Sequence, residues 1–157
     1  MRDSLFAVLF LSLTLPTAAQ SVPAEWKAIK DTKGACQILI PPDWTPFGEA
    51  GGSAVFHDPS TAIAVVTSQP GQTFKPLTEA QLKTLGVPRQ DVFEDSEKRL
   101  FYQDRKSHGT DDPSAFSAMV PAKDGACSCH IVFVPGVGDE TARKIALSLG
   151  PAPPGKT

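Results

Sequence analysis

The sequence predicts an α+β domain with a mainly antiparallel β-sheet of about six to seven strands. Short apolar or alternating segments recur along the chain between Pro, Gly and Asp residues, which is typical of strands joined by tight turns. Asp124-Gly125 stands between two such segments and favours a two-residue hairpin turn, because both residues tolerate positive φ. Two other stretches, residues 78–86 and 139–150, have apolar residues at helical spacing between capping residues.

Residues 1–19 have the three-part organisation of a secretory signal. Arg2 precedes the apolar run Leu5–Leu15, which Pro16 ends. The small residues up to Ala19 suit signal peptidase. The apolar run is about half as long as the roughly twenty residues that a membrane-spanning helix needs. We therefore expect a secreted or periplasmic protein that is cleaved near Ala19.

The rest of the chain has the size of one domain, which we place at residues 20–150. Residues 151–157 are rich in proline and predict a disordered tail. The chain has 15 Lys and Arg against 17 Asp and Glu, a formal net charge of −2, and neither sign forms a long block. A nucleic-acid-binding protein would show a basic stripe, and a membrane-surface protein a basic amphipathic helix. The sequence therefore predicts neither kind of partner after signal cleavage.

The N-terminal part of the domain combines a helical pattern with a strand. Apolar residues at helical spacing predict a short helix over Val22–Asp31. Cys36–Ile40 is an apolar strand, which Pro41-Pro42 ends because proline cannot donate to a sheet ladder. Turn-forming residues then predict a loop over Pro46–Gly52.

The middle of the chain predicts further strands and loops. The segment Thr61–Ser68 is apolar on both faces around Ala62–Val66, so we expect it at the centre of the sheet. The other predicted elements are strands at 53–57, 92–93 and 100–102, a turn at 58–60 and a solvated loop at 107–113.

Two helices have recognisable ends. Thr78 is a predicted N-cap with Gln81 as its capping-box partner, and Gly86 can end that helix. For the last helix, Asp139 is the predicted N-cap and Gly150 the residue that ends it.

The hairpin around Asp124-Gly125 separates an apolar face from a mixed face. If these two residues form the turn, Ala122 lies opposite Cys127 and Val120 lies opposite Cys129. The face that this pairing predicts as buried holds Phe116, Ala118, Val120, Ala122, Cys127, Cys129, Ile131 and Phe133. The other face holds Ser117, Met119, Ser128, His130 and Val132.

The order of these elements resembles the PsbP-like fold, which occurs in extrinsic photosystem proteins and in a Ran-binding nuclear import factor. The resemblance is carried by Ile38-Leu39-Ile40-Pro41-Pro42-Asp43-Trp44 and by the last helix through Ser148-Leu149. It implies an antiparallel sheet with helices on both faces, an α/β/α sandwich. It also implies binding or assembly, since that fold is mainly used for these purposes, and it places no functional residue on this sequence.

Three cysteines predict a disulfide, because the chain should reach an oxidising compartment. Cys127 and Cys129 are two residues apart on one strand and point the same way, so a direct bridge between them would be strained. We expect Cys36 to pair with Cys129 or with Cys127, as neighbours in one sheet, which leaves one buried thiol. Closing a loop of about ninety residues stabilises the fold by roughly 4 to 5 kcal/mol in the chain-entropy model.

A metal or thiol-redox site is the alternative interpretation. Cys127, Cys129 and His130 supply two thiolates and an imidazole for zinc or Cu(I). Residues that could complete the site are Cys36, His57 and His108. Against this, His130 lies on the other strand face and the cysteines do not have the common C-x₂-C spacing. A thiol-redox site would be expected to have a C-x-x-C motif, which the sequence lacks.

The sequence predicts no enzyme and no cofactor. It has no Gly-x-Ser-x-Gly elbow, and Ser53 and His57 would lie about 13 Å apart on a strand. We therefore expect an exported non-enzymatic domain that binds an unknown protein or small ligand. The predicted partner surface consists of Trp44, Phe47, His57 and His108, in or near the loops at 46–52 and 107–113.

Overall fold

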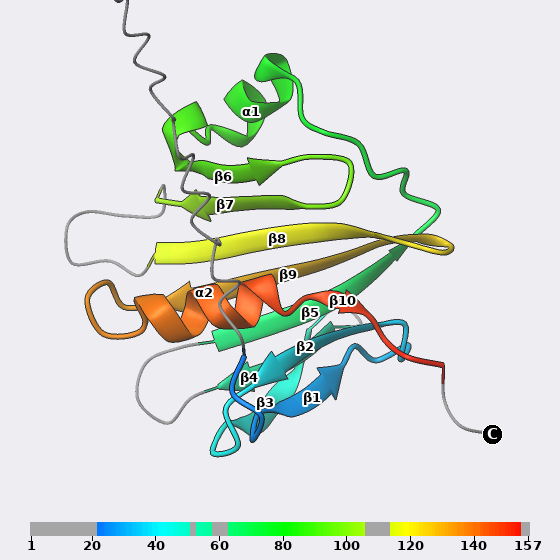
Figure 1. Ribbon diagram of the computed structural model, residues 1–157, viewed down its shortest axis with the longest axis vertical. Coiled ribbons are helices and arrows are strands. Elements are labelled where there is room, and N and C mark those ends of the chain that lie inside the picture. Colours follow the sequence, from blue (N-terminus) through cyan, green and yellow to red (C-terminus); the bar gives the residue numbers. More distant parts are fainter. Residues whose placement is uncertain (1–21, 51–52, 58–62, 106–113, 155–157) are drawn as a thin grey trace, which may run out of the picture.

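The computed structural model describes residues 22–50, 53–57, 63–105 and 114–154 (Figure 1). The predicted signal segment, the turn at 58–60 and the loop at 107–113 lie outside the described residues. The described chain forms two antiparallel sheets and two α-helices, so the α+β class is confirmed. Neither helix is long and apolar enough to cross a membrane.

Most strands belong to one sheet, here called the large sheet, which has seven strands in the order β3-β4-β5-β9-β8-β7-β6. Every neighbouring pair in it is antiparallel. Its strands are β3 (Thr45–Ala50), β4 (Ser53–His57), β5 (Ile63–Pro70), β6 (Val92–Asp95), β7 (Leu100–Asp104), β8 (Ser114–Ala122) and β9 (Gly125–Phe133). A one-turn 3₁₀ helix, Arg89–Asp91, precedes β6.

The remaining three strands form a separate small sheet with β2 (Cys36–Ile40) in the middle. Its outer strands are β1 (Lys27–Lys30) and β10 (Gly150–Pro151), both antiparallel to β2. The carboxylate of Asp31 accepts hydrogen bonds from the backbone N–H groups of Ala35 and Cys36, at 2.8 and 2.9 Å, and so holds the β1–β2 turn. The prediction that Cys36 shares a sheet with the last hairpin is therefore wrong, because the two belong to different layers.

One face of the large sheet, here called the sealed face, is covered by α2 (Asp139–Leu147) and by the small sheet (Figure 1). The Ser148 hydroxyl, at the end of α2, accepts a hydrogen bond of 2.8 Å from the backbone of Leu39 and so joins these two covers. The other helix, α1 (Glu79–Leu85), lies beside β6 at the edge of the sheet (Figure 1). A sandwich with helices on both faces of the sheet therefore stays a prediction.

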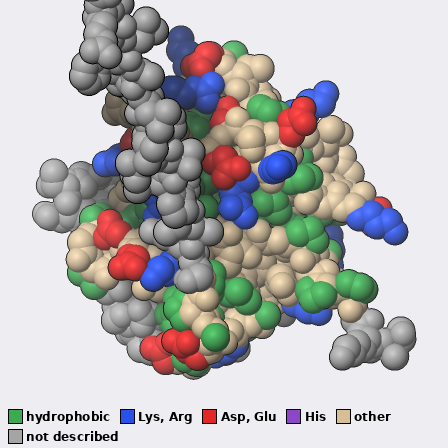
Figure 2. All heavy atoms as spheres, viewed as in Figure 1, with side chains coloured by type: hydrophobic (Ala, Val, Ile, Leu, Met, Phe, Trp, Pro, Cys, Tyr) green, Lys and Arg blue, Asp and Glu red, His purple; other side chains and the backbone are tan. Residues whose placement is uncertain are grey.

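The core lies between the sealed face and its covers. Trp44 is 2% exposed and belongs to this core, so its predicted place on a partner surface is wrong. Other core residues are Ile38, Ile40, Ala64, Val66, Phe101, Phe116, Ala118, Val120, Ile131, Phe133, Ala142, Ile145 and Ala146. On the side of the molecule seen in Figure 2, which carries α2 and the small sheet, Lys and Arg side chains are interspersed with Asp and Glu.

Two predicted elements of the N-terminal part are wrong. The predicted helix at Val22–Asp31 is instead strand β1, because its backbone completes the hydrogen bonding of β2 and this tertiary pairing outweighs a weak helical pattern. The predicted loop at Pro46–Gly52 contains most of β3. This strand tolerates Pro46 because it lies at the edge of the sheet and has a register irregularity between Pro46 and Gly48.

The last hairpin has the predicted faces in a different register. Ala122 pairs with Gly125, and Val120 with Cys127, so the turn consists of Lys123 and Asp124 rather than Asp124 and Gly125. A shift of two residues returns every side chain to the same face, since side chains alternate along a strand. Gly125, with φ of +153°, approaches β5 so closely that a Cβ there would lie 2.1 Å from the carbonyl oxygen of Gln69.

The predicted caps are confirmed for α1 and wrong for α2. Thr78 and Gln81 form the expected capping box, and Gly86 ends α1 in a left-handed conformation. In α2 the caps are Gly138 and Ser148 rather than Asp139 and Gly150.

The predicted disordered tail is ordered where it begins, and Gly150 extends the small sheet instead of capping a helix. Pro151 pairs with Cys36 in β10, and the backbone N–H of Ala152 donates to the carbonyl of Ala35 at 2.8 Å.

Candidate ligand-binding groove

The face of the large sheet opposite α2 carries a groove of about 620 Å³, here called the open-face groove. Strands β5, β9, β8 and β7 form its floor, and α1 with the segment that precedes it forms its wall. A volume of this size falls in the range of small-molecule sites. Lining residues include Val65, Thr67, Gln69, Phe74, Lys75, Leu77, Thr84, Leu85, Leu100, Tyr102, Ser117, Met119, Ser128 and His130.

Strand register explains why these residues meet. Across β7, β8, β9 and β5, one row of the floor consists of Tyr102, Ser117, His130 and Val65. The next row consists of Leu100, Met119, Ser128 and Thr67. Because side chains alternate along each strand, every residue between these positions points to the sealed face instead.

The part of the floor formed by β5 and β9 carries neutral hydrogen-bonding side chains. The side-chain amide of Gln69 donates to the Ser128 hydroxyl at 3.0 Å, and Thr67 shares a short hydrogen bond with the Ser53 hydroxyl. The carbonyl oxygen Oε1 of Gln69 is buried and has no partner among the described residues. Since a buried carbonyl normally accepts a hydrogen bond, this atom is a ready acceptor for a ligand.

Ser117 and His130 form the closest approach to a catalytic pair, with 2.9 Å between the Ser117 Oγ and the His130 Nδ1. Desolvation lowers the pKa of His130, and the charge of Asp104 opposes that shift only in part. Acyl transfer would also need N–H donors for an oxyanion. The backbone N–H groups around both residues belong to ladders, because β8 and β9 each pair on both sides. The arrangement therefore suits hydrogen bonding of the Ser117–His130 pair to a ligand better than activation of Ser117 as a nucleophile.

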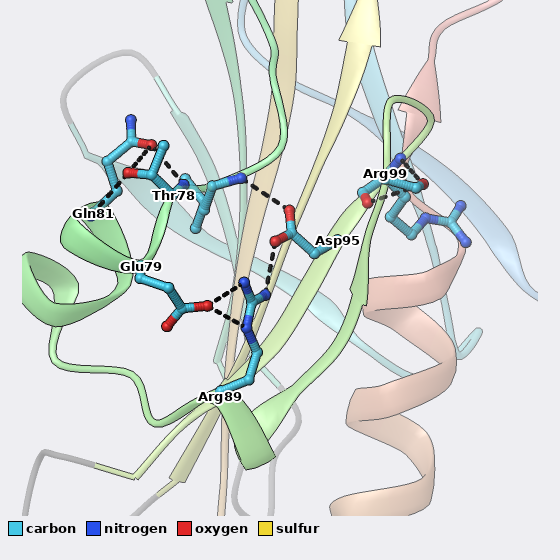
Figure 3. Close-up of polar contacts among 8 residues, drawn as sticks. Thr78, Glu79, Gln81, Arg89, Asp95 and Arg99 are labelled. Carbon is cyan, nitrogen blue, oxygen red and sulfur yellow. Dashed lines mark hydrogen bonds and ion pairs between the residues drawn. The ribbon is translucent and has the colours of Figure 1, made fainter.

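The wall of the groove is held in place by polar contacts at the start of α1 (Figure 3). Asp95, on β6, accepts a hydrogen bond of 2.9 Å from the backbone N–H of Leu77. Its second oxygen binds Arg89 at 2.8 Å, and Arg89 also binds Glu79 of α1 at 2.6 Å. These contacts, which raise the pKa of Arg89 through Asp95 first and Glu79 second, fasten α1 to the edge of the sheet.

The cysteines lie on the sealed side of the sheet. Cys36 and Cys127 form a disulfide that joins the small sheet to β9, with 5.5 Å between their Cα atoms. This is the second of the two pairings that the sequence allowed. Cys129 is the free thiol, and its burial raises its pKa to about 12. Its Sγ donates to the carbonyl of Ala146 on α2 at 3.9 Å.

The predicted alternative metal set is not assembled. Cys127 is consumed by the disulfide, and His130 lies on the opposite face from Cys129, as the alternation along β9 predicted. No group of three or more His, Cys, Asp or Glu side chains suited to a metal occurs among the described residues. Of the predicted partner-surface residues, His108 and the side chains of Phe47 and His57 lie outside what the structure describes.

Sequence reasoning missed the groove itself. The mixed face of the last hairpin contained the signal, because Ser117, Met119, Ser128 and His130 are neither wholly apolar nor wholly charged. A face exposed to bulk solvent would be expected to carry more charge. Nothing in the sequence indicated that the segment around Leu77 and α1 would close over one side of that face.

Comparisons with known proteins identify a similar fold. No family model matches the chain, and no curated protein matches it. A crystal structure of a protein from Bacteroides thetaiotaomicron VPI-5482 is similar, with a TM-score of 0.56 and 14% sequence identity. The similarity covers 84% of this chain and 50% of that chain, so this chain spans about half of that protein's length. At this identity, the similarity concerns the fold alone.

Proposed function

We propose that the protein is a non-enzymatic binding domain that acts outside the cytoplasm and holds its ligand in the open-face groove. The observation that carries the proposal is the contrast between the two sides of the same strands. The sealed face is covered by α2 and the small sheet, whereas the opposite face has a groove of about 620 Å³, in which the Gln69 carbonyl oxygen has no hydrogen-bond partner among the described residues. We propose that a bound ligand covers the open face, as α2 and the small sheet cover the sealed face.

Two features favour binding over catalysis. The described residues that line the groove include no carboxylate to orient the Ser117–His130 pair from within the site, although Asp104 affects the pKa of His130 from nearby. The floor is also built from central strands of a sheet, whose backbone N–H groups are used in the ladders and so are not available to an oxyanion.

Two observations bear on location and family. A disulfide between Cys36 and Cys127 is compatible with an oxidising compartment, in which such bonds persist. Together with the signal-like residues 1–19, it supports secretion or export to the periplasm. Membership of the PsbP-like fold family is part of this proposal, and it rests on the sequence resemblance together with the antiparallel α+β fold. The thiolate metal or redox alternative has no geometric support, because the disulfide removes one of its ligands.

A fragment screen by ¹H–¹⁵N correlation NMR tests the proposal. Uncharged and charged fragments should perturb the amide signals of Ser117, Ser128 and their neighbours in the groove. The variant Ser128→Phe fills the floor and should abolish these shifts. The matched control Pro121→Ala, on the exposed part of β8 outside the groove lining, should retain them. Fragments that bind elsewhere, or that bind Ser128→Phe equally well, would refute the assignment of the groove.

A further inference from the structure

The two ends of the open-face groove differ in chemistry. Toward α1 and β7, the lining is richer in apolar side chains and includes Leu85, Leu100 and, on the neighbouring β8, Met119, whose sulfur lies 3.9 Å from the side-chain amide of Gln72. On β5 and β9, it is richer in hydroxyl and amide groups, which belong to Thr67, Gln69 and Ser128, although Val65 also lines it there. The residues are arranged by register, so that Leu100 and Met119 stand at one end of the row that leads to Ser128 and Thr67. A ligand that fills the groove would therefore need an apolar part and a polar part.

The apolar end has surface to cover. Leu85 is 42% exposed although it lines the groove from the last turn of α1. Met119 is half-buried on the floor, facing the same space. Covering such side chains contributes about 25 cal/mol for each Å² of apolar surface removed from water. This favours a hydrocarbon group at this end.

Among the described residues that line the groove, Lys75 is the one Lys, Arg, Asp or Glu, although the carboxylate of Asp104 lies near enough to His130 to raise its pKa. Lys75 lines the groove from the segment before α1, is exposed, and forms no ion pair with the described residues. The carboxylates of Glu79 and Asp95 are held by Arg89 outside the lining. A negative head group would thus meet the Lys75 ammonium and neutral donors, whereas a positive one would meet no carboxylate among the described residues that line the groove.

We infer that the open-face groove binds a single-chain amphiphile with a carboxylate head, with its hydrocarbon chain beneath α1 and its head group within reach of Lys75 and the hydroxyls of β5 and β9. The inference rests on the proposed function and specifies its ligand. The volume of about 620 Å³ accommodates a chain of medium length. Ser128 and Thr67 can donate to the carboxylate, while the Gln69 carbonyl can accept from a water or hydroxyl that accompanies it.

Calorimetric titration of three amphiphiles with the same chain tests the inference, with the two ionic probes below their micellar concentrations and the alcohol below its solubility limit. Dodecanoate should bind more tightly than dodecanol, and dodecyltrimethylammonium should bind most weakly. Shortening dodecanoate to decanoate should weaken binding by up to about fourfold for each methylene that is buried. Equal affinities for the anionic and cationic probes, or no dependence on chain length, would overturn the inference.

Matched lysine variants locate the head group. Lys75→Met keeps the apolar part of the side chain and should weaken dodecanoate binding about threefold to tenfold, without affecting dodecanol. Lys83→Met removes an exposed charge from α1 outside the lining and should leave both affinities unchanged. If dodecanol alone shifts the groove signals in NMR, the inference fails and the proposed function stands. If no amphiphile and no fragment shifts them, both fail.

Discussion

The two faces of the large sheet are built from the same strands and differ in almost every physical property. On β9, Cys127, Cys129, Ile131 and Phe133 point to the sealed face, and each is at most 5% exposed. Ser128 and His130 stand between them on the same strand and point to the open-face groove. The comparison shows how one alternating segment can specify a core with one set of residues and the floor of a groove with the other.

The cover of each face explains the difference. The sealed face is closed by α2 and by the small sheet, which are themselves joined through Ser148 and Leu39. The disulfide between Cys36 and Cys127 then fastens this cover to β9. On the open face, α1 and the segment before it are the described parts of the chain that reach over the floor, and their anchors are contacts to Arg89 and Asp95 near the surface. Stability should therefore depend on the sealed face and ligand binding on the open one.

The largest expected effect comes from releasing the cover of the sealed face. The double variant Cys36→Ser/Cys127→Ser removes a bond that closes a segment of 91 residues, and it should lower the free energy of unfolding by about 4 to 5 kcal/mol. Urea denaturation followed by circular dichroism measures the change. Cys129→Ala keeps the disulfide and should lower it by only about 1 kcal/mol. A double variant as stable as the native chain would show that α2 alone holds the cover.

A pair of substitutions on one strand compares the two faces directly. Ile131→Ala leaves a cavity in the core at a fully buried position and should lower the free energy of unfolding by about 3 kcal/mol. Ser128→Ala, three residues earlier on the open face, removes the hydrogen bond from Gln69 and should lower it by no more than about 1 kcal/mol. The same urea titration measures both variants. Equal losses would mean that the open face is as tightly packed as the sealed one.

A smaller effect is expected where the hairpin approaches β5. Gly125→Ala places a Cβ within 2.1 Å of the Gln69 carbonyl oxygen, in a conformation with φ of +153°. We expect a loss of about 2 kcal/mol, because the hairpin must shift away from β5. Gly34→Ala is the control, since Gly34 has φ of +68° but no atom within 4 Å of an added Cβ. Its loss should be smaller, which separates backbone strain from the clash.

The sealed face was predictable from the sequence and the open face was not. Apolar alternation from Phe116 to Phe133 identified the buried side of the hairpin, even though the turn was placed two residues away from its true position. Local capping rules placed Thr78 and Gly86 correctly, because those signals depend only on neighbouring residues.

What escaped prediction depends on contacts between distant segments. The strand character of Lys27–Lys30 arises from pairing with β2, and the depth of the groove arises from the path of the chain between β5 and α1. Which cysteine pairs with Cys36 depends on how the small sheet lies over β9, since Cys127 and Cys129 share a face. The spacing of residues along the chain does not contain this information. The alternation of apolar and polar residues that identifies a buried strand face is local, and it can therefore be recognised in the sequence.

The smallest expected effect concerns the titration of His130 on the open face. His130 keeps an exposed surface, and its partial desolvation by the groove lowers its pKa from 6.5, so the imidazole is mainly neutral at pH 7. Because the unfolded chain binds this proton more readily, stability should be greatest above pH 6.5 and should decrease as the pH falls through the lowered pKa of the folded state. The groups that face the ring include Ser117, which is hydrogen bonded to its Nδ1, and Asp104, whose charge raises the pKa.

NMR titration of the histidine ring protons measures this pKa, with His130→Gln to assign the signal among the three histidines of the chain. Asp104→Asn should lower the pKa of His130 further, because it removes the charge that favours the protonated ring. A histidine on the sealed face would be locked by packing, whereas this one should respond to dodecanoate, since a carboxylate in the groove favours its protonated form. A pKa of His130 above 6.5 in the free protein would mean that water reaches the ring freely and that the open face is a shallow surface.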